Sequence, residues 1–297
     1  MHLSGLRLDR HVAALLFVTV VWGATFPILK LATASLSGVE ISALRFLIAA
    51  VCMAPWVLKV PRHTWRDGAV MGFLVLTSYV GQAYGLEFIS SNRSAFLTSL
   101  NVLMVPMLGW AWGARPDRIV FVAAALACLG IGLMSYDGGS DLLADTTTVL
   151  GALAYAAYVM LLSARSRLHI PIQLAAAQMF CMAVMGGLWM ITAGGWERVQ
   201  TLPQRMDPAL MAGLLYLGVV ASAAMFFVQA LAQRHVSADK SAVIYAMEPV
   251  FAALFAWAWL SEGMTWRAVV GAIIVVIAVV LGELKPPVSR GKTATIT

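Results

Sequence analysis

The stretches SSNRSAFLTSLN at residues 90–101 and SADKSAVIYAME at residues 237–248 align without a gap, 147 positions apart. The alignment pairs Arg93 with Lys240, Ser94 with Ser241 and Asn101 with Glu248. The same offset also matches Gln82-Ala83 with Gln229-Ala230 and Trp110-Ala111-Trp112 with Trp257-Ala258-Trp259. Ungapped matches of this length indicate an internal duplication. We therefore expect the chain to consist of two related halves.

The composition indicates that these halves lie in a membrane. Hydrophobic residues make up 61% of the 297-residue chain and charged residues 11%, against about a quarter charged residues in an ordinary soluble domain. Ten apolar stretches approach the roughly 20 residues that a membrane-spanning helix needs. They cover residues 11–32, 38–57, 68–88, 94–113, 118–136, 146–164, 171–193, 209–230, 238–260 and 266–284. The sequence therefore predicts an all-α polytopic membrane protein with ten transmembrane helices.

The sequence offers little support for an enzyme. Few residues remain between the apolar stretches for a soluble catalytic domain. Neither the GxxxxGK[ST] motif of phosphate-binding loops nor the HExxH motif of zinc proteases occurs in the sequence. The five histidines lack metal-site spacing, and the three cysteines fall at unrelated positions within predicted helices. We therefore expect no catalytic residue, no metal and no cofactor.

Basic residues are concentrated in alternate loops. If the N-terminus is cytoplasmic, fourteen of them lie on the inner side: Arg7, Arg10, Lys59, Arg62, Arg66, Arg115, Arg118, Arg165, Arg167, Arg234, Lys240, Lys285, Arg290 and Lys292. Five lie on the outer side: Lys30, Arg93, Arg198, Arg205 and Arg267. The positive-inside rule then predicts that both termini lie in the cytoplasm, including a tail at residues 285–297. This distribution accounts for the net charge of +6, so we expect no nucleic-acid partner.

The duplication also predicts the topology. Each half, residues 10–136 and 146–284, contains five predicted helices. Because five is an odd number, the second half enters the membrane in the opposite orientation to the first. Inverted halves related by a pseudo-two-fold axis in the membrane plane occur in many secondary transporters, which bind substrate near the midplane where the halves meet. The pattern therefore favours a carrier that works by alternating access.

Three groups of residues carry a family resemblance: Trp22-Gly-Ala-Thr-Phe-Pro-Ile-Leu-Lys30, Ala43-Leu-Arg45-Phe-Leu, and Ser241-Ala242 continuing to Glu248-Pro249 and Glu262. In these groups the chain resembles the EamA family of the drug/metabolite transporter (DMT) superfamily, and the resemblance extends over nearly its whole length. It implies a ten-helix inner-membrane carrier, often an exporter of amino acids or other metabolites, whose fourth and ninth helices help to line a central cavity. One departure is visible in the first half, where Asn101-Val102 stands in place of Glu248-Pro249.

Polar residues form one stripe on each of these two helices. Ser94, Thr98 and Asn101 have i, i+4, i+7 spacing, which places them on one helix face. Ser241, Tyr245 and Glu248 repeat the stripe in the ninth helix. Exposure of such a stripe to lipid is costly, so it should face a neighbouring helix or water. Asn101 and Glu248 lie near the predicted midplane and are the leading pair for substrate contact.

Glu248 and Arg45 are charged residues within predicted helices. A carboxylate near the midplane costs a few kcal/mol unless it is paired, protonated or hydrated. Glu248 can bind a substrate ammonium, carry a coupling proton, or accept hydrogen bonds beside Pro249, whose ring perturbs the helix. Arg45 can bind a substrate carboxylate, pair with Glu248 or extend to the membrane interface, and the last two are favoured. Gln178 is its counterpart in the second half.

Amide and aromatic side chains complete the predicted site. Gln82 and Gln229 are equivalent in the repeat, and amides can bind both ends of a zwitterion or join two helices. The aromatic residues within predicted helices suit flat or apolar substrates through ring contacts. The predicted substrate-binding set is Trp22, Tyr79, Gln82, Thr98, Asn101, Tyr158, Gln229, Tyr245 and Glu248, with Glu248 and Arg45 as the residues for coupling or charge pairing.

Taken as a sequence, the chain is expected to export small metabolites, with amino acids favoured and aromatic or apolar members foremost among them. The alternatives are a carrier for other metabolites, drugs or nucleotide sugars, or a passive channel. Facilitated diffusion and proton antiport both remain open, as do a monomer and a homodimer. The expected partners are a small-molecule substrate and the lipid bilayer.

Overall fold

The computed structural model describes residues 9–89, 91–113, 116–135, 141–260 and 265–283, and this part of the chain is helical without any strand. Seven of its helical segments are long and apolar enough to cross a membrane: Arg10–Ala32, Gly38–Val57, Arg62–Phe88, Leu142–Leu168, Pro171–Thr192, Pro208–Ala232 and Ala238–Trp259. Three shorter apolar helices are Phe96–Ala111, Arg118–Leu133 and Trp266–Gly282. The all-helical, polytopic membrane architecture is therefore confirmed. The predicted tail at residues 285–297 lies outside the described residues, as do Arg7 and Arg115 of the charge pattern.

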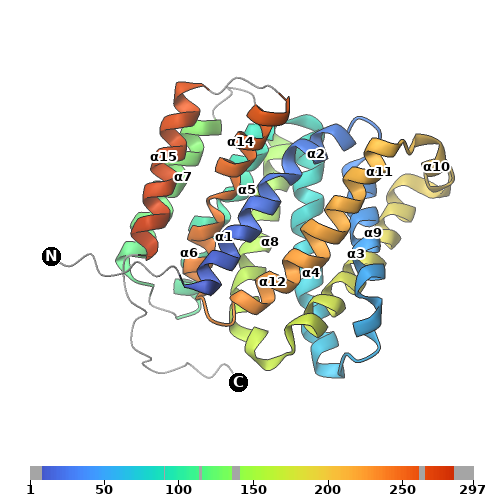
Figure 1. Ribbon diagram of the computed structural model, residues 1–297, viewed down its shortest axis with the longest axis horizontal. Helices are drawn as coiled ribbons and strands as arrows, with labels where there is room; N and C mark the ends of the chain where they lie inside the picture. Colours follow the sequence, from blue (N-terminus) through green and yellow to red (C-terminus); the bar gives the residue numbers. More distant parts are fainter. Residues whose placement is uncertain (1–8, 90, 114–115, 136–140, 261–264, 284–297) are drawn as a thin grey trace.

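Several predicted spans consist of two or more helical pieces (Figure 1). The elements in chain order are α1 (Arg10–Gly23), α2 (Thr25–Ala32), α3 (Gly38–Val57), α4 (Arg62–Phe88), α5 (Ser91–Ser99), α6 (Asn101–Ala111), α7 (Arg118–Ser135), α8 (Leu142–Arg165), the 3-10 turn η1 (Ser166–Leu168), α9 (Pro171–Gln200), α10 (Leu202–Arg205), α11 (Pro208–Leu215), the π-helix η2 (Tyr216–Ala224), α12 (Met225–Ala232), α13 (Ala238–Tyr245), α14 (Glu248–Leu260) and α15 (Trp266–Glu283).

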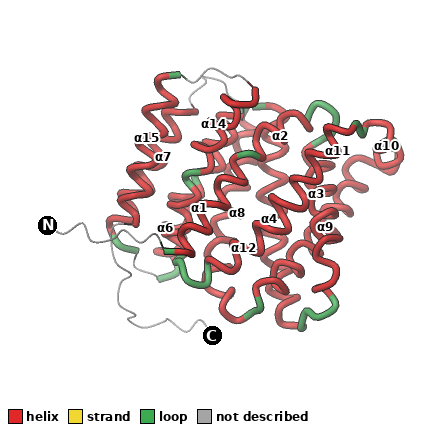
Figure 2. The backbone as a smooth tube through the Cα atoms, in the orientation of Figure 1, coloured by secondary structure: helices red, strands yellow, loops and turns green. Residues whose placement is uncertain are grey.

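The bundle is elongated, with α7 and α15 packed together at one end and α3 and α9 at the other (Figures 1 and 2). Between these pairs, α4 packs along α8, and α1 packs against α12, α13 and α14. The largest core cluster lies among these central helices and includes Leu15, Phe46, Tyr158 and Phe226. The centre of the bundle therefore brings both halves of the chain into contact.

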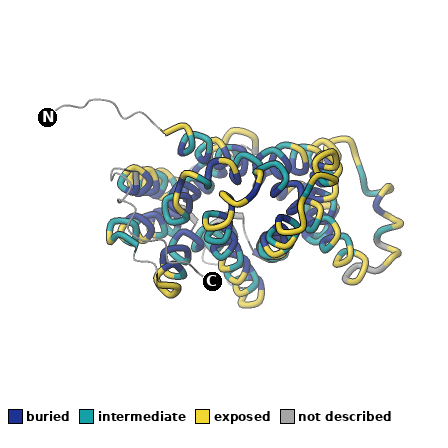
Figure 3. Tube along the Cα trace, turned by 90° about the horizontal axis from the view of Figure 1, so that it is seen from below, coloured by how far each residue is buried: buried dark blue, intermediate teal, exposed yellow. Residues whose placement is uncertain are grey.

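Large apolar side chains also cover the outside of the bundle. Leu47, Phe73 and Leu129 are 52%, 57% and 69% exposed. Figure 3 shows exposed residues along the outward faces of the helices and buried residues toward the interior. An apolar exterior of this extent is unfavourable in water. It suits a lipid environment, where the polar backbone is satisfied inside each helix.

The predicted spans 94–113 and 238–260 are interrupted at positions that match in the repeat. The first break lies between Ser99 and Asn101 and the second between Tyr245 and Glu248. In the second half, Pro249 has no backbone N–H and its ring crowds the carbonyl of the residue four positions earlier. In the first half, Asn101 Nδ2 instead donates to the Thr98 carbonyl at 2.9 Å, a local bond that competes with the helical ladder. Different residues thus produce the same interruption.

The predicted span 11–32 is interrupted as well, at Ala24. Pro27 explains the break, because it lacks the N–H that would bond to Gly23. The Thr25 hydroxyl donates to the Trp22 carbonyl at 2.6 Å and satisfies a carbonyl at the break. Gly23 also permits a close approach to α14, since a Cβ there would lie 2.6 Å from the Cβ of Phe251. The break therefore occurs where α1 meets the second half of the chain.

Candidate functional site

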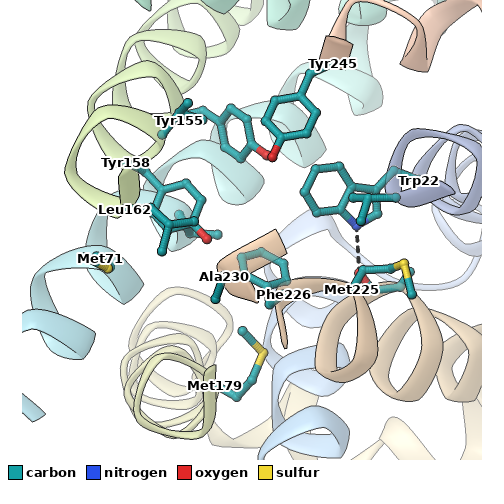
Figure 4. Close-up of a cluster of buried hydrophobic side chains, with 14 of the residues drawn as sticks. Trp22, Met71, Tyr155, Tyr158, Leu162, Met179, Met225, Phe226, Ala230 and Tyr245 are labelled. Carbon is teal, nitrogen blue, oxygen red and sulfur yellow. Dashed lines mark hydrogen bonds between the residues drawn. The ribbon is translucent and has the colours of Figure 1, made fainter. Parts of the chain in front are cut away.

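Six aromatic rings from five helices meet in the middle of the bundle. Figure 4 shows those of Trp22, Tyr155, Tyr158, Phe226 and Tyr245. We call this group the aromatic cluster: Trp22, Tyr79, Tyr155, Tyr158, Phe226 and Tyr245. The Trp22 ring lies 5.8 Å from those of Phe226 and Tyr245 and 6.2 Å from that of Tyr155, measured between centroids. Tyr158 lies 5.5 Å from Tyr155, and Tyr79 lies 6.2 Å from Phe226. These separations and tilts are those of favourable ring contacts.

Hydrogen bonds fix the orientation of the rings. Trp22 Nε1 donates to the Ala221 carbonyl at 2.8 Å, which ties α1 to η2. The Tyr158 hydroxyl donates to Gln229 Oε1 at 3.0 Å, and Gln229 Nε2 donates to the Tyr155 hydroxyl at 3.3 Å. The Tyr245 hydroxyl donates to Gln233 Oε1 at 3.3 Å. Buried polar atoms of the cluster are thereby satisfied, as an apolar interior requires.

Arg45 lies beside the cluster and is 1% exposed. Its Nε donates to Ser222 Oγ at 3.0 Å, and its Cζ lies 4.6 Å from the centroid of the Tyr79 ring and 5.2 Å from that of Phe46. These three contacts hold the guanidinium inside the bundle rather than at the membrane interface. Its Nη2 is buried and has no hydrogen-bond partner among the described residues.

Glu248 is the first residue of α14 and is half-buried. It follows Tyr245 by three residues, and the Tyr245 ring contacts Trp22 at 5.8 Å, so α14 begins beside the aromatic cluster. A carboxylate at a helix N-terminus is favoured by the unpaired backbone N–H groups there. The salt bridges that the structure describes join other residues, so Glu248 and Arg45 do not form an ion pair.

The polar stripe of the first half lies on α5 and α6. Ser94 and Asn101 are buried and Thr98 is half-buried. The Thr98 hydroxyl donates to the Ser94 carbonyl at 2.8 Å. Ser94 Oγ and Asn101 Oδ1 have no partner within the described part of the chain, and the same is true of Ser241 Oγ, the repeat equivalent of Ser94. Buried polar atoms without partners are costly, which marks places where a ligand or water can bind.

The predicted residues thus separate into two groups. Trp22, Tyr79, Tyr158 and Tyr245 belong to the aromatic cluster, and Gln229 bonds to it. Gln82 lies on α4 about one turn from Tyr79 and is half-buried. Thr98 and Asn101 lie at the break between α5 and α6, and α6 packs against α8 and α13, which carry rings of the cluster.

Sequence reasoning missed two residues of the cluster. The predicted set lacks Phe226, although this residue stands 147 positions after Tyr79 and is therefore its repeat equivalent. The set also lacks Tyr155, although the offset of 133 that pairs Arg45 with Gln178 pairs Trp22 with Tyr155. The repeat offsets were the signal that could have found both residues.

A pocket of about 580 Å³ lies elsewhere, at the periphery between α6 and α7. Leu103, Met107, Trp110, Pro116 and Phe121 line it. It contains no predicted site residue and no charged side chain. Its apolar lining is typical of a surface that contacts lipid, so we place the candidate site at the aromatic cluster and the two helix breaks.

Comparison with known proteins agrees with this architecture. A relative in Archaeoglobus fulgidus, named "Uncharacterized transporter", is 26% identical over 272 residues, which cover 91% of this chain and 85% of the relative. "Uncharacterized transporter YoaV" of Bacillus subtilis is 22% identical over 271 residues, which cover 87% of this chain and 91% of that protein. A solved structure titled "Crystal structure of protein" superposes with a TM-score of 0.73 at 13% identity, covering 92% of this chain and 97% of the other, and shows a shared fold.

The family models give the broader classification. The model described as the EamA-like transporter family matches this chain twice, at residues 10–136 and 142–282. The two matches together extend over most of the described helices, including those that carry the aromatic cluster and both helix breaks. The chain therefore belongs to the EamA-like transporter family.

Proposed function

We propose that this transporter is a secondary carrier of the cell inner membrane that exports small metabolites, amino acids above all, by alternating access. Three buried polar atoms without partners among the described residues carry the proposal: Asn101 Oδ1 at the first helix break, and the repeat-equivalent hydroxyl oxygens of Ser94 and Ser241, each within about two turns of a break. Interrupted helices expose backbone and side-chain polar groups to a substrate near the midplane of many carriers. The rings provide an apolar surface for the rest of the substrate.

The packing supports ten helices in two inverted halves, residues 10–136 and 146–284. Under a pseudo-two-fold axis, a helix either packs against its own counterpart or makes a contact that its counterpart repeats elsewhere in the bundle. α3 packs on its counterpart α9, and α7 packs on its counterpart α15. The contact of α4 with α8 corresponds to that of α12 with α1, and the contact of α6 with α8 corresponds to that of α14 with α1. Exchange of these corresponding contacts provides a route to inward and outward conformations.

A passive channel is the weaker alternative. A channel needs a continuous polar path, whereas the centre of this bundle is closed by rings whose hydroxyl groups bond to Gln229 and Gln233. Opening a path would require these contacts to separate. Such a closed centre is expected of a carrier, which exposes its site to one side at a time.

Uptake by proteoliposomes that contain the purified protein tests the substrate class. A panel of labelled amino acids is supplied with and without a pH gradient, with empty liposomes as the control. We expect saturable uptake of a subset that is richest in aromatic and apolar members. Absence of uptake for every amino acid under both conditions would contradict the amino-acid assignment and direct the panel to other metabolites, drugs and nucleotide sugars.

A further inference from the structure

The two charged groups of the site are not repeated by its pseudo-two-fold symmetry. Arg45 and Glu248 have Gln178 and Asn101 as their repeat equivalents, at offsets of 133 and 147. The equivalents are both neutral amides. Gln178 Nε2 donates to Met71 Sδ at 3.1 Å, and the amide oxygens of Gln178 and Asn101 have no partner among the described residues. The site therefore has a charged side and an uncharged, hydrogen-bonding side.

The guanidinium of Arg45 is held in place, but not all of its hydrogen-bond donors have an acceptor. Its bond to Ser222 and its position over the Tyr79 ring fix its plane, and its burial separates it from bulk water. The remaining Nη2 donor has no described partner. An unsatisfied buried donor on a charged group is among the more costly features of a protein interior. A ligand acceptor at Nη2 would remove that cost.

Glu248 and Arg45 lie on either side of Trp22, yet none of the described salt bridges joins them. Trp22 bonds to Ala221, the neighbour of the Ser222 that holds Arg45, and its ring contacts Tyr245, three residues before Glu248. If the pair served stability alone, attraction in a poorly polar interior would favour direct contact, because isolated buried charges are costly. Arg45 is instead held by other residues. Its Nε donates to Ser222 and its guanidinium lies over the Tyr79 ring, whereas Glu248 begins α14 beside Pro249. The separation provides a place for a ligand that carries both opposite charges.

We propose that Arg45 and Glu248 bind the two ends of a zwitterion, with Arg45 Nη2 on the substrate carboxylate and Glu248 on its ammonium group. This inference rests on the proposed transport function and deepens it, because it requires both charges on the same molecule. The rings beside Glu248 receive the apolar side chain, and the neutral amides of Gln178 and Asn101 leave a second full charge uncompensated. Neutral α-amino acids are therefore bound better than acidic or basic ones.

Three probes of similar shape separate the two contacts in the wild-type carrier. Phenylalanine carries both charges, phenethylamine lacks the carboxylate, and 3-phenylpropionate lacks the ammonium group. Each is added unlabelled to proteoliposomes that take up labelled phenylalanine. Each analogue lacks one charge-assisted hydrogen bond, so we expect half-inhibition by either analogue to need at least about tenfold more compound than by phenylalanine.

Variants assign each contact to its residue. Arg45→Gln and Glu248→Gln should each raise the KM for phenylalanine at least about tenfold. In Arg45→Gln, phenethylamine should compete as well as phenylalanine, because the carboxylate no longer has its partner. In Glu248→Gln, 3-phenylpropionate should compete as well as phenylalanine, because the ammonium group no longer has its partner. Arg165→Gln is the matched control, since Arg165 is an exposed cation whose described contact is with Asp67 near the start of α4.

The outcomes separate this inference from the function on which it rests. Wild-type uptake of phenylalanine with equal competition by all three compounds would overturn the zwitterion contacts while the transporter stands. A KM in both charge variants within twofold of Arg165→Gln would do the same. No wild-type uptake of any amino acid would overturn both proposals. The competition experiment uses the wild-type protein, so it decides the matter even where a buried Arg45 variant does not fold.

Discussion

At the scale of single residues, Gln229 is hydrogen-bonded on both sides of its amide. It accepts from Tyr158 and donates to Tyr155, and it is fully buried, whereas its repeat equivalent Gln82 is half-buried. The sequence identified both glutamines as equivalent and placed both in the site. It could not distinguish their surroundings, because the neighbours of Gln229 come from α8, more than 70 positions earlier in the chain.

Gln229→Leu should therefore destabilise the folded protein by about 1 kcal/mol, the order found for hydrogen bonds between membrane helices. The substitution leaves two buried tyrosine hydroxyl groups without this partner. Gln82→Leu is the matched control and should have a smaller effect, because Gln82 is only half-buried. Unfolding of both variants in detergent, followed by circular dichroism, measures the difference. Equal stability of the two variants would show that the bonds of Gln229 contribute nothing.

Glu248 also permits a test of coupling. It is the carboxylate beside the aromatic cluster, whereas Glu40, Asp67 and Asp145 form ion pairs near the ends of their helices. If a pH gradient drives wild-type flux, Glu248→Gln should abolish the dependence on the gradient, because an amide cannot carry the proton. Glu87→Gln is the control, since Glu87 accepts from the Gly38 N–H at 2.7 Å at a helix end. Unchanged pH dependence in Glu248→Gln would exclude this role.

At the scale of elements, the two helix breaks are the main feature that the hydropathy pattern did not predict. Pro249 indicated a perturbed helix, but the first half has Val102 at the equivalent position. There the break depends on the side-chain bond from Asn101 to the Thr98 carbonyl, which cannot be deduced from hydropathy. The repeat nevertheless placed Asn101 and Glu248 at equivalent positions, and these are the first residues of α6 and α14.

Pro249→Ala should slow transport while it stabilises the ninth span. Alanine restores a backbone donor and removes the ring, so a continuous helix gains up to about 3 kcal/mol. If about 1.4 kcal/mol of this opposes the conformational change, kcat falls about tenfold. Pro55→Ala, at an exposed proline inside α3, is the control and should leave kcat nearly unchanged. A Pro249→Ala carrier with a higher or unchanged kcat would argue against a role of the helix break in the conformational change.

The close contact between α4 and α8 requires glycine at position 81 of α4. A Cβ on Gly81 would lie 2.7 Å from the Thr147 carbonyl oxygen, whereas a Cβ on Gly187 would meet nothing within 4 Å. Gly81→Ala should therefore destabilise the protein by about 1–3 kcal/mol, the usual cost of overpacking. Gly187→Ala should be neutral or slightly stabilising, because alanine favours helices. Thermal unfolding of the pair in detergent measures this, and equal midpoints would contradict the close contact.

At the scale of the whole molecule, composition and hydropathy were sufficient to predict an all-helical membrane protein. Seven segments satisfy the length and hydropathy of a span, and the other three predicted spans coincide with shorter apolar helices. Five of the basic residues on the predicted inner side lie outside the described residues: Arg7, Arg115, Lys285, Arg290 and Lys292. Within the described part, α1 begins and α15 ends on the same side of the bundle (Figure 1), as an even number of spans requires.

Trans-stimulation of efflux tests the alternating-access proposal most directly. Proteoliposomes are loaded with labelled phenylalanine, and its efflux is measured with and without saturating unlabelled phenylalanine outside. We predict saturable efflux that accelerates several-fold when external substrate is present, because a loaded site returns across the membrane without an empty transition. Efflux that rises linearly with the internal concentration and does not respond to external substrate would indicate a channel and contradict the proposal.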